Sequence, residues 1–330
     1  MSLPDNCVED LWFPDGNIVI RAGDRLCRVY KGFLAAQSPV LADMLSIPQP
    51  ETVETFDEVP VVTLPDDPKE VLHWLKALLF PKYFEVHPHK IAVHKLFAVL
   101  RLSHKYDVQY LRQRALYHLS TEFATNLAEY RRGTAEWCSS IRFPPGGDRI
   151  DSDGYIDFVR DAYTVVREAG AVWLLPCILY CLHVTARLIS APLDRTAEGI
   201  SPTDLLSLWQ ISGTTARIFG VSITEKWAEC TSNACEAIDK YMIDDLYTNL
   251  LFHPLGFSRP DTDGDDDVHF DADTLKCSLC TPCYQEFYQE YLQLCGTFWE
   301  ELPRIIGLPD WPELLEMKAR DLGMSADSAK

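Results

Sequence analysis

The hydrophobic pattern of this 330-residue chain changes its period after about residue 64, and this change constrains the fold more than any other feature. Over residues 17–30, two short apolar runs flank a Gly23-Asp24 turn, and the second run alternates, which predicts a β-hairpin. VPVVTL at 59–64 predicts another strand, with Pro60 near its start, where proline disrupts pairing least. Beyond this point apolar residues recur at spacings of three and four, which predicts helices. The sequence therefore predicts an α+β domain followed by a mostly α-helical domain.

Three helical faces follow the last predicted strand. They comprise Val71, Leu72, Leu75, Leu78 and Leu79; Val93, Leu96, Phe97 and Leu100; and Val108, Leu111, Ala115 and Leu119. Further along, Ser201-Pro202-Thr203-Asp204 predicts a helix start, with serine as the N-cap, proline at the first position and an acid at the third.

A turn-rich stretch, RFPPGGD at 142–148, predicts the boundary between the two domains. The predicted organisation is an N-terminal segment (1–14), the α+β domain (15–130), a linker (131–150), the helical domain (151–318) and a disordered tail (319–330). An acidic stretch at 261–273 predicts a solvated loop within the helical domain.

The net charge of −19 arises from 49 acidic and 30 basic residues, and it argues against nucleic acid as a partner. The acidic N-terminus does not resemble a signal or transit peptide. Eleven cysteines, an odd number, are typical of free thiols in a reducing compartment. We therefore expect a cytoplasmic or nuclear protein.

Residues 169–186 carry no Lys, Arg, Asp or Glu and just reach the length of a membrane-spanning helix. Pro176 and His183 lie within this segment, and it lacks a basic flank on one side. These features favour a pair of buried helices, which also places Cys177 and Cys181 in a core. We expect no membrane association.

The stretch CSLCTPC places Cys277, Cys280 and Cys283 at the spacing of a zinc knuckle. Cys295 is excluded as a fourth ligand if Cys283 already lies on the following helix, because the rise of that helix separates the two by ~18 Å. The alternatives are a structural zinc site, a redox pair, and cysteines that simply pack as small apolar residues. Packing is favoured, so the expected cofactor is none, with structural zinc as the alternative.

Motifs of common enzyme classes are absent from the sequence. It contains no G-x-S-x-G elbow, no phosphate-binding G-x-x-x-x-G-K loop, no G-x-G-x-x-G after a strand and no H-E-x-x-H pair. We therefore expect neither enzymatic activity nor a small-molecule substrate.

The stretch VYKGFLAAQSPVLADML, residues 29–45, places Ser38-Pro39 where a single helix would be continuous. Ser38 is a good N-cap and proline is favoured at the first helical position, so the stretch predicts two helices that meet at a corner. In this interpretation Phe33 and Leu34 face the strands. Val40, Leu41, Met44 and Leu45 run toward a surface.

The order of elements over 15–125 resembles the BTB (POZ) domain. The matching positions are Val29, Lys31, Leu34, Ala35, Ser38, Pro39, Met44, Leu64, Lys105, Tyr106 and Leu111. Tyr30 departs from the usual histidine, Leu41 and Leu45 stand where aromatic residues are usual, and Asn17 lies near a usual aspartate. The remainder of the chain is similar to expanded fungal proteins with a single BTB domain.

The resemblance implies a protein-interaction module that binds itself or another BTB protein, and in many relatives binds the ubiquitin-ligase scaffold cullin-3. Swapping of N-terminal segments between two copies is in doubt, because only about a dozen residues precede the hairpin. A hydrophobic-x-Glu element that favours cullin contact corresponds to Phe56-Asp57-Glu58. The alternatives are a cullin-3 adaptor and a zinc-stabilised transcriptional regulator. The predicted interface residues are Leu11, Trp12, Phe13, Val40, Leu41, Met44, Leu45, Phe56 and Glu58.

Overall fold

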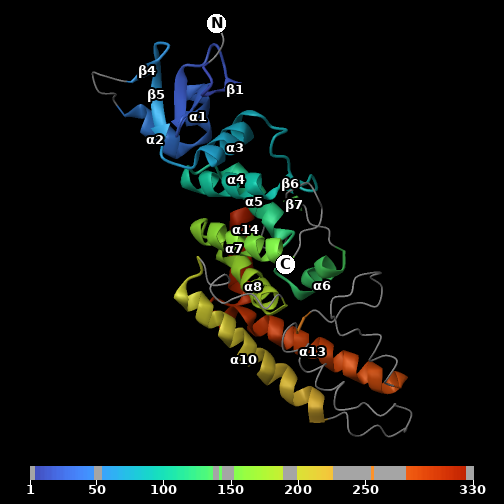
Figure 1. Ribbon diagram of the computed structural model, residues 1–330. Helices are drawn as coiled ribbons and strands as arrows, with labels where there is room; N and C mark the ends of the chain where they lie inside the picture. Colours follow the sequence, from blue (N-terminus) through green and yellow to red (C-terminus); the bar gives the residue numbers. More distant parts are fainter. Residues whose placement is uncertain are drawn as a thin grey trace.

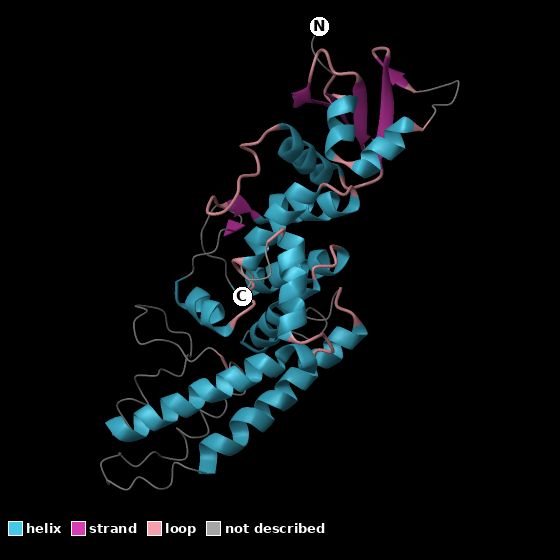
Figure 2. Ribbon diagram, turned by 180° about the vertical axis from the view of Figure 1, so that it is seen from behind, coloured by secondary structure: helices cyan, strands magenta, loops and turns pink. Residues whose placement is uncertain are grey.

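A computed structural model describes residues 4–47, 54–136, 141–142, 152–188, 199–225, 254–255 and 280–324. The chain has a mixed α/β fold, with a small curled sheet at one end and helices over the rest (Figures 1 and 2). The strands are β1 (Cys7–Trp12), β2 (Ile18–Ala22), β3 (Arg25–Val29), β4 (Thr55–Phe56), β5 (Val59–Leu64), β6 (Ile91–Ala92) and β7 (Ile141–Arg142). The helices of the N-terminal half are α1 (Lys31–Gln37), α2 (Pro39–Ser46), α3 (Pro68–Leu79), α4 (Val93–Lys105), α5 (Gln109–Ser120) and α6 (Leu127–Glu136). Those of the C-terminal half are α7 (Ser152–Glu168), the 3-10 helix η1 (Val172–Leu174), α8 (Leu175–Leu188), α10 (Pro202–Glu225), α13 (Thr281–Ile305) and α14 (Trp311–Leu322).

The five-stranded sheet has the order β1-β3-β2-β5-β4. β2 and β3 pair antiparallel, which confirms the predicted hairpin, and the predicted strand at 59–64 is β5, parallel to β2. β1 was not predicted. It pairs in parallel with β3 at the sheet edge, with an irregular register. Its four apolar residues, Cys7, Val8, Leu11 and Trp12, do not alternate with polar ones, so the sequence pattern did not predict a strand here.

The two faces of the sheet belong to different apolar clusters. The alternating residues Ile18, Ile20 and Ala22 join the main core, which also includes helices α2 and α3. Val19 joins a small cluster on the opposite face with Leu26, Val59 and Val61. Both faces of the sheet are therefore apolar, and Cys7, Trp12 and Phe56 pack on the second face.

One continuous apolar core extends from the sheet through α4 and α5 to the C-terminal helices α7, α8 and α13. Segment 169–186 forms η1 and most of α8, and most of its described side chains are buried, Cys177 and Cys181 included, as predicted. None of the helices in the described ranges is long and apolar enough to cross a membrane.

Two of the predicted boundaries fall inside helices. The linker predicted from residue 131 begins inside α6, and the tail predicted from residue 319 begins inside α14, which continues to Leu322. α14 extends this far because Asp321 accepts hydrogen bonds from Arg112 Nη1 on α5 (2.9 Å) and from Trp173 Nε1 on η1 (2.8 Å). The helix then ends at Gly323, whose φ of 63° suits glycine.

Candidate protein-interaction surface

Ser38 forms the corner between α1 and α2, as predicted. Its backbone is extended, its Oγ accepts a hydrogen bond from Leu41 N at 3.0 Å, and Pro39 begins α2. The hydroxyl also donates to the backbone oxygen of Tyr106 at the end of α4. Because Ser38 is fully buried and bonded on both sides, it fixes the direction of α2 relative to α4.

One face of α2 is mostly apolar and open to solvent, with Asp43 as its one acid. Val40, Met44 and Ile47 are spaced by four and three residues, so they lie on one side of the helix. Val40 is 40% exposed, Ile47 at the helix C-cap is 62% exposed, and Met44 is partly buried. Phe33 of α1 is 37% exposed rather than facing the strands, which corrects its predicted position.

We name these four residues, Phe33, Val40, Met44 and Ile47, the α1–α2 surface. Between residues 31 and 47 the only charged side chains are Lys31 and Asp43. Such a low density of charge is unusual in a chain with 79 charged residues, 49 acidic and 30 basic. Depletion of charge together with exposed aliphatic, aromatic and methionine side chains is typical of the centre of a protein–protein interface.

Three of the predicted interface residues are core residues instead. Leu41 is 1% exposed and Leu45 3%, because they lie on the opposite side of α2 from Val40. Leu11 of β1 is fully buried against the same core. Periodicity alone identified α2 as amphipathic but did not show which of its apolar positions the sheet would cover.

The other two predicted N-terminal residues are half-covered. Trp12 packs edge-on against Phe56, with ring centroids 5.5 Å apart, over the outer face of the sheet. Phe13 lies 5.1 Å from the Tyr30 ring and packs on the main core. Both aromatic side chains thus cover apolar neighbours within the chain.

The Phe56-Asp57-Glu58 element forms the tip of a hairpin between β4 and β5. Asp57 and Glu58 both have positive φ, 49° and 63°, as in a two-residue turn of the primed type. Glu58 is exposed, whereas Phe56 is occupied by its contact with Trp12. The structure therefore presents the acid of this element to solvent and only part of the aromatic ring.

The cysteine stretch is described only in part, because Cys277 lies outside the described residues. Cys280 is the N-cap of α13, and Cys283 lies in its first turn. Cys295 belongs to the same helix and is buried, which confirms the premise that separated it from Cys283. Within the described ranges no three His, Cys, Asp or Glu residues are arranged to hold a metal ion.

A polar cleft of about 540 Å³ lies where α3, α4 and α7 meet. Its lining consists of Asp67, Lys69, Glu70, His73, His94, Phe97, Arg101, Asp161 and Thr164. Arg101 is engaged on two sides, since it pairs with Glu70 of α3 and donates from Nε to Glu168 of α7 at 2.6 Å. This arrangement joins three helices, so we interpret the cleft as a structural junction.

Burial lowers the pKa of His73 in this cleft from 6.5 to about 4, and nearby His94, Lys95 and Lys76 contribute. The unfolded chain takes up a proton near pH 6.5 and the folded chain does so only near pH 4, so stability falls as pH decreases between these values. We expect the melting temperature to decrease over this window. The decrease should be smaller for His73→Gln, measured by thermal scans at several pH values. Equal decreases in both proteins would contradict this role of His73.

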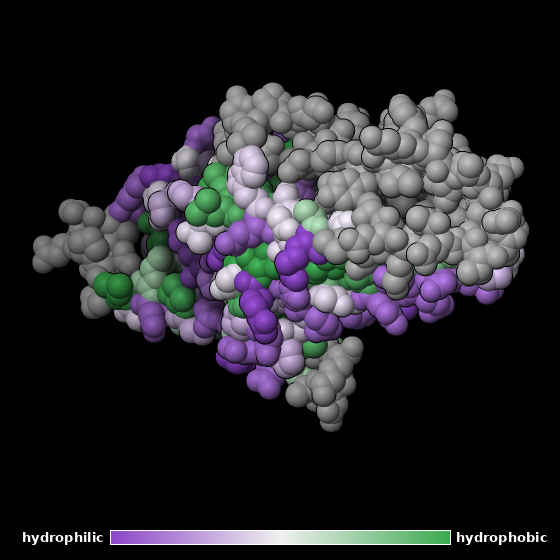
Figure 3. All heavy atoms as spheres, turned by 90° about the horizontal axis from the view of Figure 1, so that it is seen from below, coloured by the Kyte–Doolittle hydropathy of each residue, from purple (hydrophilic) through white to green (hydrophobic). Residues whose placement is uncertain are grey.

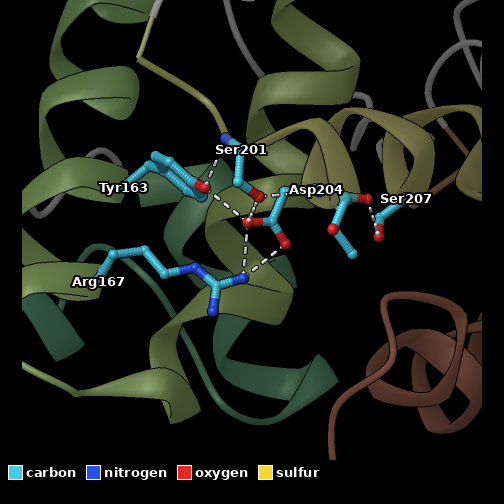
Figure 4. Close-up of polar contacts among 6 residues, drawn as sticks. Tyr163, Arg167, Ser201, Asp204 and Ser207 are labelled. Carbon is cyan, nitrogen blue, oxygen red and sulfur yellow. Dashed lines mark hydrogen bonds and ion pairs between the residues drawn. The ribbon is translucent and has the colours of Figure 1, made fainter.

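A buried polar network, not predicted as a unit, connects α7 to α10 (Figure 4). The predicted cap is confirmed, since Asp204 N donates to Ser201 Oγ at 3.1 Å. The Asp204 carboxylate also accepts from Tyr163 Oη at 2.6 Å and from Arg167 Nη2 at 2.5 and 2.7 Å. Tyr163 and Arg167 are four residues apart on α7, which is the only sequence signal that could have linked them. The Asp204 carboxylate and the Tyr163 hydroxyl are both hydrogen-bonded within the protein, so we interpret the network as structural.

The face of the molecule seen in Figure 3 shows apolar side chains in small patches among hydrophilic ones. Exposed single apolar residues are therefore ordinary on this face, and a candidate surface needs several of them on one element.

The chain matches no protein-family model, no curated protein and no solved structure. The structure therefore defines a mixed α/β protein with an apolar, charge-poor corner between α1 and α2.

Proposed function

We propose that this chain is a non-enzymatic protein-interaction protein, and that residues 15–130 are a BTB domain that binds a second copy or another BTB protein. The order of hairpin, two-helix corner, strand and helices supports the BTB assignment, together with the capped corner at Ser38. The C-terminal helices pack on residues 15–130 through one continuous apolar core.

The observation that carries this proposal is the α1–α2 surface. Its side chains project from two short helices fixed by Ser38, and no described part of the chain covers Val40 or Ile47. Burial of such residues stabilises association by ~25 cal/mol per Å², less the loss of freedom on binding. A stable interface needs ~800 Å² on each side, so this surface would form its centre and polar neighbours its rim.

The test is a double variant, Val40→Asp/Ile47→Asp, in the full chain. We expect association to weaken at least about tenfold, because two carboxylates would be desolvated at the interface. Sedimentation velocity measures self-association, and affinity capture with mass spectrometry measures binding to other BTB proteins.

The matched control is Leu206→Asp, since Leu206 is 65% exposed on α10, far along the chain from this corner. The control should associate like the unchanged chain, and both variants should melt within a few degrees of it. Loss of association in the control as well, or unchanged association in the double variant, would refute the proposal.

A second proposal is that the protein is a cullin-3 substrate adaptor. The exposed Glu58 at the tip of the β4–β5 turn favours it, because this acid is available to a partner. The captured fractions described above should then contain cullin-3, and Glu58→Lys should remove it. A capture without cullin-3 at micromolar protein would exclude the adaptor role while leaving BTB association untouched.

A further inference from the structure

The solvent face of α5 has an unusual composition for this acidic chain. It consists of Gln109, Tyr110, Gln113, Arg114 and Tyr117. Tyr110 is 39% exposed and Tyr117 43%, and this face carries no acidic residue. A helix face that is merely solvated is normally rich in Glu and Lys, whereas exposed Tyr and Arg are enriched in binding sites.

The segment between α3 and β6 is held against α5. Arg114 Nη1 donates to the backbone oxygen of Phe84 at 2.6 Å, and His118 Nε2 lies 2.9 Å from the backbone oxygen of Glu85. The Phe84 side chain is fully buried and packs edge-on against the His118 ring. These contacts fix the segment in place before any partner binds, which reduces the entropy lost on binding.

Fixing this segment brings two more side chains to the same surface. Val86 follows the anchored residues and is 54% exposed. The His87 ring lies 5.6 Å from the Tyr117 ring, and the Arg114 guanidinium lies 5.8 Å from the centre of the Tyr110 ring. We name Val86, His87, Tyr110, Arg114 and Tyr117 the α5–loop surface. α5 itself packs against α4 and α14, so the surface lies on a helix that two other helices hold in place (Figure 1).

The charge of this surface is opposite to that of the whole protein. Residues 82–90 contribute Lys82 and Lys90 against the single acid Glu85, and α5 adds Arg114. Asp107, just before α5, accepts a hydrogen bond from Gln109. A local excess of cations in a chain of charge −19 favours an acidic ligand at this position and repels few of its charges.

We propose that the α5–loop surface binds a short acidic segment of another protein that carries an aromatic or aliphatic side chain. The apolar side chain would pack against Tyr110, Tyr117 and Val86, while the Arg114 guanidinium beside the Tyr110 ring attracts a carboxylate. A short peptide is favoured over nucleic acid because a nucleic acid carries a phosphate at every nucleotide and would extend beyond this surface over the acidic rest of the chain, whose net charge is −19. This surface is distinct from the α1–α2 surface, and neither proposal requires the other.

The test presents the immobilised full chain with two pools of synthetic peptides. Each acidic peptide has Asp or Glu at fixed positions and one central Phe, with the remaining positions randomised. The control pool replaces every acid by its amide. We expect the acidic pool to be retained about tenfold more than the amide pool at low salt, and this preference to shrink as salt screens the charges.

The variant Tyr110→Ala/Tyr117→Ala locates the binding. It should reduce retention of the acidic pool about tenfold, because exposed aromatic anchors carry much of the energy of such contacts. Leu206→Ala/Trp209→Ala, which removes exposed apolar side chains from α10, should retain the pool unchanged. Equal retention of the two pools, full retention by the tyrosine variant, or equal loss in the α10 variant would each overturn the proposal.

Discussion

Leu41→Asp is expected to unfold the N-terminal part of the protein, with a loss of at least about 4 kcal/mol in the free energy of unfolding. Leu41 is 1% exposed, so the new carboxylate would be buried in the core without a partner. Its backbone N–H is the group that Ser38 caps, so distortion here would also loosen the corner between α1 and α2. Urea denaturation followed by circular dichroism measures the change.

The neighbouring variant Val40→Asp is the control for this prediction. Val40 is 40% exposed, so the same carboxylate would remain hydrated and stability should change by less than about 1 kcal/mol. The two substitutions introduce identical chemistry at adjacent positions and differ only in burial. Similar losses in both, or a stable Leu41→Asp protein, would show that α2 is oriented differently from the structure described above.

Asp204→Ala is expected to destabilise the C-terminal helices by about 2–4 kcal/mol. The Asp204 side chain is 3% exposed and accepts hydrogen bonds from Tyr163, Arg167 and Ser201. Its removal leaves the tyrosine hydroxyl without its acceptor and the first turn of α10 without its acid. The Arg167 side chain is 36% exposed, so water partly solvates its charge and the loss stays below that of a fully buried pair.

Asp157→Ala provides the comparison. Asp157 pairs with Arg160 on α7 at 2.9 Å, but its side chain is 44% exposed. Such a surface pair contributes at most about 0.5 kcal/mol. Thermal melts of both variants test the contrast, and a loss in Asp204→Ala no larger than that in Asp157→Ala would mean that the network in Figure 4 does not stabilise the junction.

Local signals account for the parts of the fold that were predicted correctly. The β2–β3 hairpin follows from a Gly-Asp turn between apolar runs, and the starts of α2 and α10 follow from serine followed by proline. Each of these features depends on residues within a few positions of one another. β1 was missed because its apolar residues come in two pairs around Glu9 and Asp10, which is neither an alternating pattern nor a continuous apolar run.

The candidate site was predicted only in part. The sequence identified the α1–α2 corner and placed Val40 and Met44 in it, but it also included Leu11, Leu41 and Leu45, which are buried. The α5–loop surface was not predicted, because it arises from hydrogen bonds that join residues 30 or more positions apart.

The sequence by itself determined the β2–β3 hairpin, strand β5, the change from strands to helices and the corner at Ser38, because hydrophobic period, capping and turn geometry are local properties of a chain. The tertiary structure alone decided which side of each amphipathic helix is covered. On α2, Leu41 lies in the core and Val40 faces the solvent. At the end of α14, Asp321 accepts hydrogen bonds from Arg112 and Trp173, which lie far away in the sequence. The burial of a side chain depends on which helices and strands pack against it, and the residues beside it in the sequence do not determine that packing.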